Sequence, residues 1–431
     1  MKGLDLMSKN AFEVLRSRGF IDWMSEEDKV PELFESGMVT AYVGFDPTAD
    51  SLHVGHLIPL MGLAWLQRLG HRPIVLAGGG TGMIGDPSLK SKERNLLSAE
   101  EIAHNVECVK HQLAHFVNFD CGENSALLLN NFDWLSKMNF LDFLRDVGKY
   151  FTINKMIAKE HVRSRIEDPT KSLSFTEFAY SLLQSYDFYY LYTHYNCRIQ
   201  MGGNDQQGNI TSGIDFIRKH EEGAPVYGGT NPLLLTSAGH KFGKTEGGAV
   251  WLDPKKTSPY QFYQFWLNSE DGILPKTLRY FTFKSEEEID EIVARHNSAP
   301  EKRVGQKTLA YEITKIVHGE KAADGAKHAS EILFGGAYTP EDLDEETLKA
   351  LAAETPHAFV ETLPLPLADV LAQTKACKSK GEAKRLIAGG GVSINGIRAD
   401  AKTSLEEKDI LCGHYALVRM GKKKYIMVGR K

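Results

Sequence analysis

The sequence predicts an α/β protein in which a Rossmann-like parallel sheet covered by helices is followed by a helical domain and a small α/β domain. Three observations lead to this prediction. Strand-like and helical segments alternate through the first 230 of the 431 residues, the pattern then changes to helices alone, and a short basic unit with both types closes the chain. A chain of this length is expected to form two or three domains of roughly 100–200 residues.

Alternating elements make up the predicted first domain, residues 1–230. Short apolar runs predict strands, and longer amphipathic runs predict helices. In chain order we expect a strand at 41–45, a helix at 57–69, a strand at 72–77, a helix at 99–116, a strand at 126–130, a helix at 175–192, a strand at 198–201 and a helix at 210–218. This alternation gives mainly parallel strands, and ligands of such sheets bind at the carboxyl ends of the strands.

Helical periodicity dominates the second predicted domain, residues 231–335, with helices at 259–267, 285–295 and 301–318. An acidic, weakly patterned stretch at 336–362 predicts a linker or a helical excursion. The last predicted domain, 363–431, contains a capping box at 379–382 that opens a helix to residue 388, a strand at 392–394, an Asn-Gly turn at 395–396 and a final strand at 425–428.

Composition and charge narrow the class of protein. The chain is 42% hydrophobic and 25% charged, as in a globular protein, and no apolar run reaches the roughly 18 residues of a membrane span, so we expect a cytoplasmic protein without membrane contact. Five scattered cysteines without a CxxC motif predict reduced thiols. Residues 363–431 carry 14 Lys and Arg against 6 Asp and Glu, whereas the whole chain has a net charge of −5. This basic end is expected to hold a polyanion, although a solvated charged face would look the same.

Two short motifs indicate where a nucleotide binds. The first, His53–His56, follows a predicted strand and opens a predicted helix, and Gly55 lets a ligand approach the backbone. The second, Lys241–Thr245, places two ammonium groups, of Lys241 and Lys244, on a short glycine-bearing loop. Together they predict nucleotide activation without a Walker loop.

A glycine-rich segment, residues 78–85, follows the strand predicted at 72–77. It matches the GxGxxG pattern of dinucleotide-binding folds, but Asp86-Pro-Ser and a basic stretch with Lys90 and Arg94 stand where the helix should begin. An NAD-dependent dehydrogenase is therefore the weaker alternative. We predict close approach of a small ligand, with Asp86 as the counter-ion of an amine and the two cations near phosphate.

Two further groups of polar residues are candidates for ligand binding. Tyr180, Gln184 and Asp187 have the spacing i, i+4, i+7 and share one helix face, which suits a polar ligand about as well as a solvent-facing stripe. Asp205 follows the strand at 198–201, where a carboxylate can accept two ribose hydroxyls or cap the next helix.

A stripe of potential metal ligands lies on the helix predicted at 99–116. It consists of His104, Cys108, His111 and His115, with Cys121 beyond the helix. One helix cannot surround a tetrahedral zinc ion. We therefore predict a half-buried helix face and no metal site.

With these motifs assembled, the chain resembles the bacterial-type tyrosyl-tRNA synthetases, which are class I aminoacyl-tRNA synthetases, over nearly its whole length. Residues 42–56 resemble the HIGH motif of that family, 241–245 its KMSKS loop, 180–187 its tyrosine-binding helix, and the last 65 or so residues its small RNA-binding domain. The resemblance implies activation of L-tyrosine with ATP and Mg²⁺, release of pyrophosphate, and transfer of tyrosine to the 3′ terminal adenosine of tRNA(Tyr). It also implies a homodimer and no prosthetic group.

The same resemblance assigns roles to residues. The tyrosine substrate would be bound by Tyr42, Asp46, Asp86, Tyr180, Gln184, Asp187 and Gln206. ATP would contact Gly44, Gly55, Gly203, Asp205 and Lys244. Reaction at the phosphates would depend on Thr48, His53, His56, Lys90, Arg94, Lys241, Lys244 and Thr245. Phosphates of tRNA would contact Lys378, Lys380, Lys384, Arg385, Arg398, Lys422, Lys423 and Lys424.

The sequence departs from the family pattern at two positions, and two other functions are alternatives to this assignment. Gln207 stands where the family often has Trp, and Val43 where Cys is frequent. A tryptophanyl-tRNA synthetase shares the expected fold, but the phenol-directed pair Tyr42 and Asp187 disfavours it. A non-catalytic RNA-binding protein on the same scaffold would not need to keep the histidines and lysines of both motifs.

Overall fold

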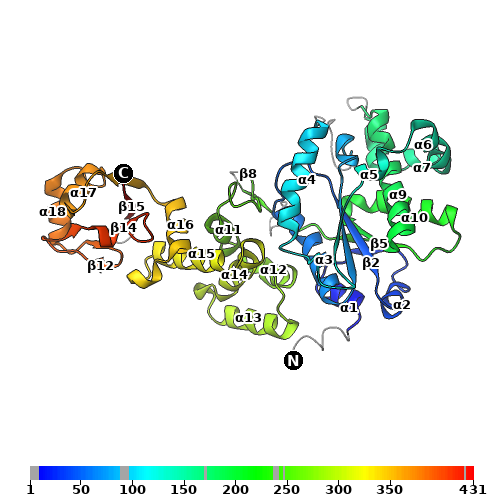
Figure 1. Ribbon diagram of the computed structural model, residues 1–431. Coiled ribbons are helices and arrows are strands. Elements are labelled where there is room, and N and C mark those ends of the chain that lie inside the picture. The colour runs from blue at the N-terminus through cyan, green and yellow to red at the C-terminus, as the bar shows by residue number, and fades with distance from the viewer. Residues whose placement is uncertain (1–8, 88–96, 169–171, 236–241, 246–247, 422–423) are drawn as a thin grey trace. The chain divides into compact units, whose positions relative to one another are not determined.

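The computed structural model describes residues 9–87, 97–168, 172–235, 242–245, 248–421 and 424–431. The chain divides into two compact units (Figure 1). The first comprises residues 1–252 and 270–291, and the second comprises residues 253–269 and 292–431. Among the described residues, no helix combines the length and apolarity needed to cross a bilayer.

A six-stranded sheet forms the centre of the first unit, in the spatial order β1-β6-β5-β2-β3-β4. Only the short edge strand β1 runs antiparallel to its neighbour, and the other pairs are parallel. The strands are β1 (Trp23–Met24), β2 (Thr40–Phe45), β3 (Arg72–Ala77), β4 (Leu127–Asn130), β5 (Cys197–Gly203) and β6 (Tyr227–Asn231). The predicted Rossmann-like parallel sheet is therefore confirmed.

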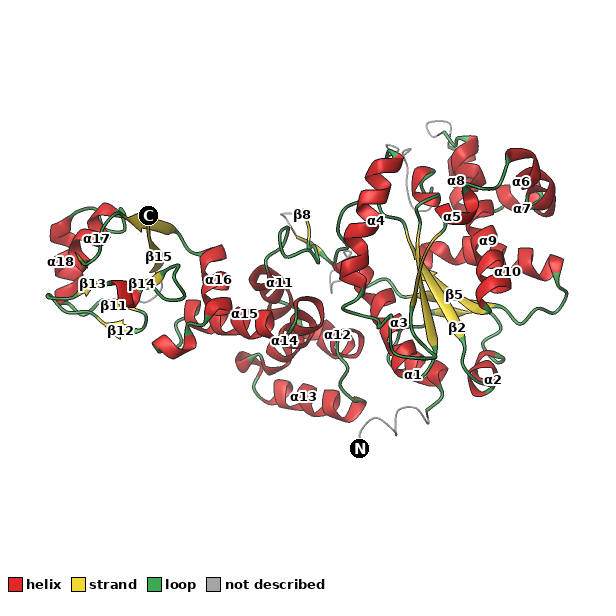
Figure 2. Ribbon diagram, viewed as in Figure 1, coloured by secondary structure: helices red, strands yellow, loops and turns green. Residues whose placement is uncertain are grey.

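Helices cover both faces of this sheet (Figure 2). The helices described in the first unit are α1 (Ala11–Ser17), α2 (Val30–Glu35), α3 (Leu57–Arg68), α4 (Ala99–Leu113), α5 (Phe132–Leu135), α6 (Phe140–Asp146), α7 (Ile153–Ile157), α8 (Glu160–Ile166), α9 (Phe175–Tyr195), α10 (Gln207–His220) and α12 (Leu274–Phe281). Side chains alternate between the faces of a strand, so neighbouring residues of β2 enter different layers. Tyr42 packs with Phe188 of α9 and Ile210 of α10, whereas Val43 lies on the side of α1 and α3.

Helix α9 carries the predicted ligand stripe, and its sequence fixes both ends. Ser174 accepts from the backbone of Glu177 while the Glu177 carboxylate accepts from the backbone of Ser174, which completes a capping box. Asn196 ends the helix in the left-handed conformation with φ 51°. The helix therefore runs through Tyr195 with 180, 184 and 187 on one face.

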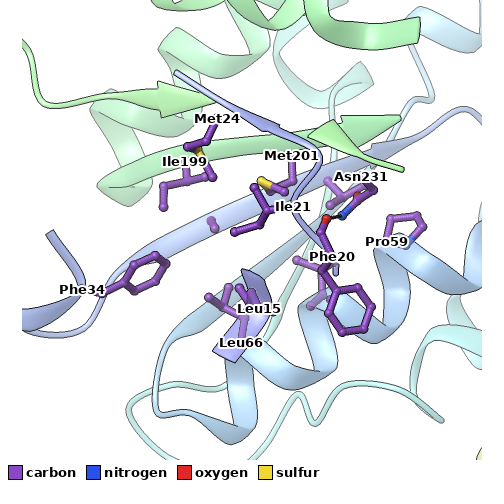
Figure 3. Close-up of a pocket in the computed structure, with 14 residues that line it drawn as sticks. Leu15, Phe20, Ile21, Met24, Phe34, Pro59, Leu66, Ile199, Met201 and Asn231 are labelled. Carbon is purple, nitrogen blue, oxygen red and sulfur yellow. Dashed lines mark hydrogen bonds between the residues drawn. The ribbon is translucent and has the colours of Figure 1, made fainter. Parts of the chain in front are cut away.

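An apolar cavity of about 30 Å³ lies between the sheet and helices α1 and α3. Figure 3 shows Phe20, Leu66, Pro59 and Met201 around it. The cavity is large enough for about one or two water molecules and is too small for a nucleotide or an amino acid. It is a packing defect in the core and not the substrate site.

This cavity provides a stability prediction at Gly62, which lines it from the middle of α3. We expect Gly62→Ala to raise the free energy of unfolding by about 1 kcal/mol, because alanine is the better helix former. A Cβ there would lie 3.7 Å from the nearest atom of Phe20, an ordinary contact. Urea denaturation measures the change. Gly213→Ala in α10 is the matched control, because its Cβ would lie 3.2 Å from Phe188 and 3.3 Å from Gln200, so it should gain less or lose stability. A larger gain at Gly213 than at Gly62 would contradict the prediction.

The second unit begins with helices and ends in a five-stranded sheet of order β12-β11-β14-β15-β9. Its helices are α11 (Pro259–Leu267), α14 (Val304–His318), α15 (Glu320–Leu333), α16 (Glu345–Glu354), α17 (Leu367–Gln373) and α18 (Lys380–Ala388), and α13 (Glu286–Ser298) crosses the boundary between the units. The strands of the whole second unit, which include β10 and β13 outside this five-stranded sheet, are β9 (His357–Val360), β10 (Leu365–Pro366), β11 (Val392–Ile394), β12 (Ile397–Arg398), β13 (Ser404–Leu405), β14 (Ala416–Met420) and β15 (Lys424–Arg430). The capping box predicted before α18 is present in part, because Ser379 accepts from Glu382 while the Glu382 carboxylate accepts from Lys378.

The segment at 336–362 holds more structure than its composition indicates. It contains α16 and β9, and β9 pairs in parallel with β15. Leu343, Leu348 and Leu351 are buried in one apolar cluster with Leu417 and Met427. Helix α16 agrees with the helical excursion predicted as one of the two alternatives for this stretch, whereas the strand that it gives to the last sheet was not predicted.

Candidate active site

A pocket of about 520 Å³ opens at the carboxyl ends of the parallel strands of the first unit. Its walls come from the segments that follow β2, β3, β5 and β6, together with one face of α9. The sequence-predicted residues that line it are Tyr42, Gly44, Asp46, Thr48, His53, Gly55, His56, Asp86, Tyr180, Gln184, Asp187, Gly203, Asp205 and Gln206. The fold thus brings together motifs up to 164 positions apart, because parallel strands end at the same edge.

The inner end of the pocket is built around the Asp187 carboxylate, which is 2% exposed. Asn131 Nδ2 donates to one of its oxygens at 2.9 Å, and Trp134 Nε1 donates to the other at 2.7 Å. Burial raises the pKa of Asp187 to about 7, against the lowering effect of these two donors. Burial and this carboxylate also raise the pKa of Tyr42. The phenol of Tyr42 therefore stays protonated at neutral pH.

Three buried polar atoms around this end have no hydrogen-bond partner within the described part of the chain. They are the Tyr42 hydroxyl, Gln184 Oε1 and Gln200 Oε1. Leaving a buried polar atom unpaired costs about 1–3 kcal/mol, so a ligand that pairs with these three atoms would regain that free energy on binding. A hydroxyl that both donates and accepts, together with acceptors beside it, suits a ligand with its own polar hydrogen atoms.

Two carboxylates mark the middle of the pocket. Asp46 accepts from the Tyr180 hydroxyl at 3.0 Å and from Thr81 Oγ1 at 2.9 Å. Asp86 accepts from Gln206 Nε2 at 2.5 Å. Burial, and then the carboxylates of Asp46 and Asp86, raise the pKa of Tyr180, so that its hydroxyl remains a donor. Two carboxylates in this part of the pocket can attract a bound ammonium group.

His53 and His56 form a reciprocal pair at the start of α3. The backbone N–H of Gly55 donates to His53 Nδ1 at 3.0 Å, and the backbone N–H of His53 donates to His56 Nδ1 at 3.1 Å. Burial, and then the neighbouring His53, lower the pKa of His56 to about 3, so this ring is neutral at pH 7. With Nδ1 accepting, a neutral ring carries its proton on Nε2, which can donate to an anionic oxygen.

Gly55 has a structural role besides the backbone approach that its position predicts. A Cβ at this position would lie 2.7 Å from Cε1 and 2.9 Å from Nδ1 of His53, so any side chain would displace the imidazole. The glycine-rich segment after β3 shows the same restriction at Gly78, where a Cβ would lie 2.2 Å from Asp46 Oδ1. Within the described residues, a short 3-10 helix (Thr81–Met83) follows these glycines where a dinucleotide fold requires a long α-helix, and the next described α-helix, α4, starts at Ala99.

Some predicted site residues cannot be placed around the pocket. Lys90, Arg94 and Lys241 lie outside the described residues, as do Lys422 and Lys423 of the basic end. Lys244 and Thr245 form strand β7, which pairs with β8 (Gly248–Ala249), and only their backbone is described.

The remaining predicted RNA contacts are exposed on the second unit. They are Lys378, Lys380, Lys384, Arg385, Arg398 and Lys424. Lys380 pairs with Asp369 at 2.5 Å, and Lys424 Nζ donates to the Ala376 carbonyl at 3.0 Å. These two lysines are therefore partly committed to contacts within the unit.

Sequence reasoning missed several polar residues of the pocket. Asn131 and Trp134 hold Asp187, Thr81 holds Asp46, and Gln200 faces the inner end. Asn131 also donates to Thr81 Oγ1 at 2.9 Å, which links the two carboxylates into one network. Asn131 directly follows β4, so its place after a predicted strand was the one available signal.

Comparison with known proteins identifies the family of this architecture. Residues 35–335 match the model for "tRNA synthetases class I (W and Y)", and residues 347–428 match the model for "Tyrosine--tRNA ligase SYY-like C-terminal domain". The tyrosine–tRNA ligase of Roseiflexus castenholzii is 49% identical over 96% of this chain and 98% of its own length. Tyrosine–tRNA ligase 1 of Bacillus subtilis is 48% identical over 98% of this chain and all of its own length. A C-terminally truncated mitochondrial tyrosyl-tRNA synthetase of Aspergillus nidulans superposes with a TM-score of 0.69 and 32% identity, covering 76% of this chain and 94% of that one.

Proposed function

This chain belongs to the class I tyrosyl-tRNA synthetases, and from that membership we propose which of its residues carry out each part of the reaction. The enzyme is a tyrosine–tRNA ligase that activates tyrosine with ATP and then charges tRNA. The observation that carries the proposal is the buried Tyr42–Asp187 end of the pocket, with its unpaired hydroxyl and amide oxygens.

We propose that the substrate phenol binds between Tyr42 and Asp187, where it donates to the carboxylate and accepts from the Tyr42 hydroxyl. Phenylalanine would bury these groups without a partner, and the cost of unpaired buried polar groups disfavours its binding. The substrate ammonium then lies near Asp86, Tyr180 and Gln184, with the Asp46 carboxylate behind Tyr180. Gln206 is next to Asp86 and is proposed to face the substrate carboxylate.

The chemical step needs alignment more than a proton acceptor, because the tyrosine carboxylate is already a nucleophile at neutral pH. Its oxygen attacks the α-phosphorus of ATP, and the bond to the β-phosphate oxygen breaks as pyrophosphate leaves. We propose that His53 and the neutral ring of His56 donate from Nε2 to phosphoryl oxygens, with Thr48 beside them and Asp205 on the ribose. Lys90, Arg94, Lys241, Lys244 and Thr245 are proposed to stabilise the pyrophosphate, and Mg²⁺ enters with ATP.

Binding of tRNA is proposed for the helical part and the basic end of the second unit. Exposed lysine and arginine side chains of 363–431 would contact phosphates, with β9 completing the sheet of that domain. We retain 1–230 as the catalytic domain and 231–335 as the helical domain of this proposal. We also propose that the enzyme is cytoplasmic, which accords with tyrosine, ATP and tRNA as its substrates.

We also propose that the enzyme is a homodimer. Of the fourteen large apolar side chains exposed in the described part of the chain, eight fall between residues 132 and 175: Phe132, Phe140, Leu141, Leu144, Ile153, Ile157, Ile166 and Phe175. This concentration on α5–α9 (Figure 1) is typical of a surface covered by a second copy. Helix α9 starts at Phe175 and carries Asp187, so the proposed interface is continuous with the tyrosine-binding helix.

Phe175→Asp is expected to convert the dimer into monomers, as measured by sedimentation equilibrium. Phe175 is 70% exposed, and an acidic side chain in the first turn of a helix is favourable, so α9 itself should be preserved. The matched control is Phe334→Asp, at a side chain 74% exposed in the second unit, which should leave the dimer intact. A monomeric wild type, or dissociation by both variants alike, would contradict this interface.

The proposed recognition is tested by exchange of pyrophosphate into ATP with tyrosine, tryptophan or phenylalanine offered separately. We expect exchange with tyrosine alone. Exchange with tryptophan would contradict the role of Tyr42 and Asp187. Absence of exchange with all three would mean that the pocket does not activate an amino acid.

A further inference from the structure

The connection between β2 and the histidine motif is held to helix α4 by Asn105 and Gln112, and Gln112 also bonds Ser51 of this connection. This connection, residues 46–53, carries Thr48 and ends at His53. Asn105 Nδ2 donates to the Pro47 carbonyl at 2.9 Å near its start. The Leu52 backbone N–H donates to Gln112 Oε1 at 2.9 Å near its end. Asn105 and Gln112 are seven residues apart and therefore lie on one face of α4.

Apolar packing between α4 and this connection is incomplete. A cavity of about 290 Å³ separates them, lined on the helix side by Val106, Val109 and Leu113 and on the other side by Pro47 and Leu52 together with the proposed nucleotide-binding residues Thr48, His53 and His56. A well-packed core fixes a backbone through many small contacts, and a cavity removes those contacts. The hydrogen bonds that Asn105 and Gln112 make therefore contribute more to fixing the place of this connection than they would in a fully packed interface.

Hydrogen bonds hold both the backbone N–H and the backbone carbonyl of Leu52. Its N–H is bound by Gln112, and its carbonyl accepts from the Leu252 backbone at 2.8 Å. Two residues farther along, the backbone N–H of Val54 donates to the Val250 carbonyl at 3.0 Å. His53 thus lies in a short stretch held between a side chain of α4 and the backbone at 250–252. Of these restraints, the one that a single substitution can remove is Gln112.

We propose that Gln112 and Asn105 are positioning residues that set the place of Thr48 and His53 for the triphosphate of ATP. The inference rests on the proposed roles of Thr48 and His53, and it assigns α4 to the nucleotide half of the reaction. A lost tether would let the connection move into the cavity, and a shift of about 1 Å in a positioning segment can cost much of the rate. The tyrosine half of the pocket, on the other face of the sheet, should be unaffected.

The test compares Gln112→Met with Gln112→Glu in tyrosine-dependent pyrophosphate exchange. Methionine keeps the length of the side chain but removes the acceptor for Leu52, and we expect kcat/KM for ATP to fall about tenfold, the effect of one lost hydrogen bond. Glutamate keeps the acceptor for Leu52 and for the Ser51 hydroxyl, although it loses the Nε2 donor to Ser51 Oγ, and it should retain activity within about threefold of the wild type. Equilibrium binding of tyrosine without ATP should be the same in all three proteins. His111→Ala, at an exposed neighbour on α4, is the matched surface control.

His53→Ala separates this inference from the proposed function. If His53→Ala lowers kcat/KM for ATP and Gln112→Met does not, the positioning role is wrong and the role of His53 stands. If neither variant changes ATP kinetics, the proposed nucleotide site itself is wrong. If Gln112→Met and Gln112→Glu lose ATP and tyrosine binding equally, with a lowered melting temperature, Gln112 only stabilises the fold and the inference is overturned.

Discussion

Replacing Asp187 by alanine is expected to lower kcat/KM for tyrosine in pyrophosphate exchange by about a hundredfold or more. The substitution removes a charged hydrogen-bond acceptor for the substrate phenol, leaves Trp134 Nε1 without its acceptor and leaves Asn131 Nδ2 bonded to Thr81 alone. Such losses cost about 3 kcal/mol in a buried site, which corresponds to roughly two orders of magnitude in rate. The preference for tyrosine over phenylalanine should fall at the same time, because the group that distinguishes them is gone.

Two control variants test whether the lower kcat/KM of Asp187→Ala comes from loss of the buried carboxylate. Asp215→Ala removes an exposed carboxylate of α10 whose contact with Lys155 is 3.7 Å long, and we expect less than about a twofold change. Asp187→Asn keeps the shape of the side chain but not its charge, so it separates the charge from the packing. If Asp187→Ala discriminated against phenylalanine as strongly as the wild type does, the phenol would bind elsewhere.

The same carboxylate predicts the pH dependence of tyrosine activation. Burial raises the pKa of Asp187 to about 7 in the free enzyme, so the acceptor form is lost as the pH falls through 7. The pH profile of kcat/KM reports ionisations of the free enzyme. We therefore expect kcat/KM for tyrosine to decline below pH 7 with one apparent pKa near that value, and Asp187→Asn to abolish this step. A profile that is flat from pH 6 to pH 8 would contradict the assignment.

Loss of Arg165 is expected to have the largest effect on stability. Arg165 and Glu177 are both buried, at 4% and 6% exposure, and form two parallel hydrogen bonds of 2.7 and 3.0 Å that join α8 to the first turn of α9. Arg165→Met would leave the Glu177 carboxylate buried without its cationic partner and with only its capping contacts to Ser174, at a cost of about 3–5 kcal/mol in the free energy of unfolding. Hydrogen exchange of the α8 and α9 amides, together with urea denaturation, measures it.

Arg163 offers the matched comparison on the same helix. It lies 3.9 Å from Glu167, with both side chains more than half exposed, so Arg163→Met should cost well under 1 kcal/mol. The double variant Arg165→Met/Glu177→Met removes both charges and should recover much of the loss. Equal effects of Arg163→Met and Arg165→Met would show that burial of the pair is not what stabilises this region.

The sequence was sufficient for several central strands and helices and for the motif positions that determine the general place of the pocket. The strand at 72–77 and the helix at 259–267 have the predicted bounds, and α9 keeps 180, 184 and 187 on one face of the pocket. These features depend on local chemistry: side-chain periodicity, caps and glycines at strand ends. The family resemblance rested on the same short motifs, and the comparisons confirm it.

Composition was a poor guide at 336–362, where the low apolar periodicity concealed a strand. The partner of β9 is β15, about 70 residues farther along the chain. A short strand on the edge of a sheet needs few apolar residues of its own, and its pairing is visible only in three dimensions. A truncation before residue 363 would therefore remove the neighbour of β9 and expose the apolar cluster that holds Leu343 and Leu351.

The sequence by itself determined which residues could meet a nucleotide and an amino acid, because a strand that ends in a parallel sheet delivers its next residues to one edge. Only the tertiary structure decided which of them are held, and by what. Asp187 depends on partners 53 and 56 positions away, Asp46 on Tyr180 at a separation of 134, and the segment before His53 on Gln112 at 60. Hydrogen bonds over such separations leave no periodicity in the sequence, since each needs only one donor and one acceptor that the fold brings within 3 Å.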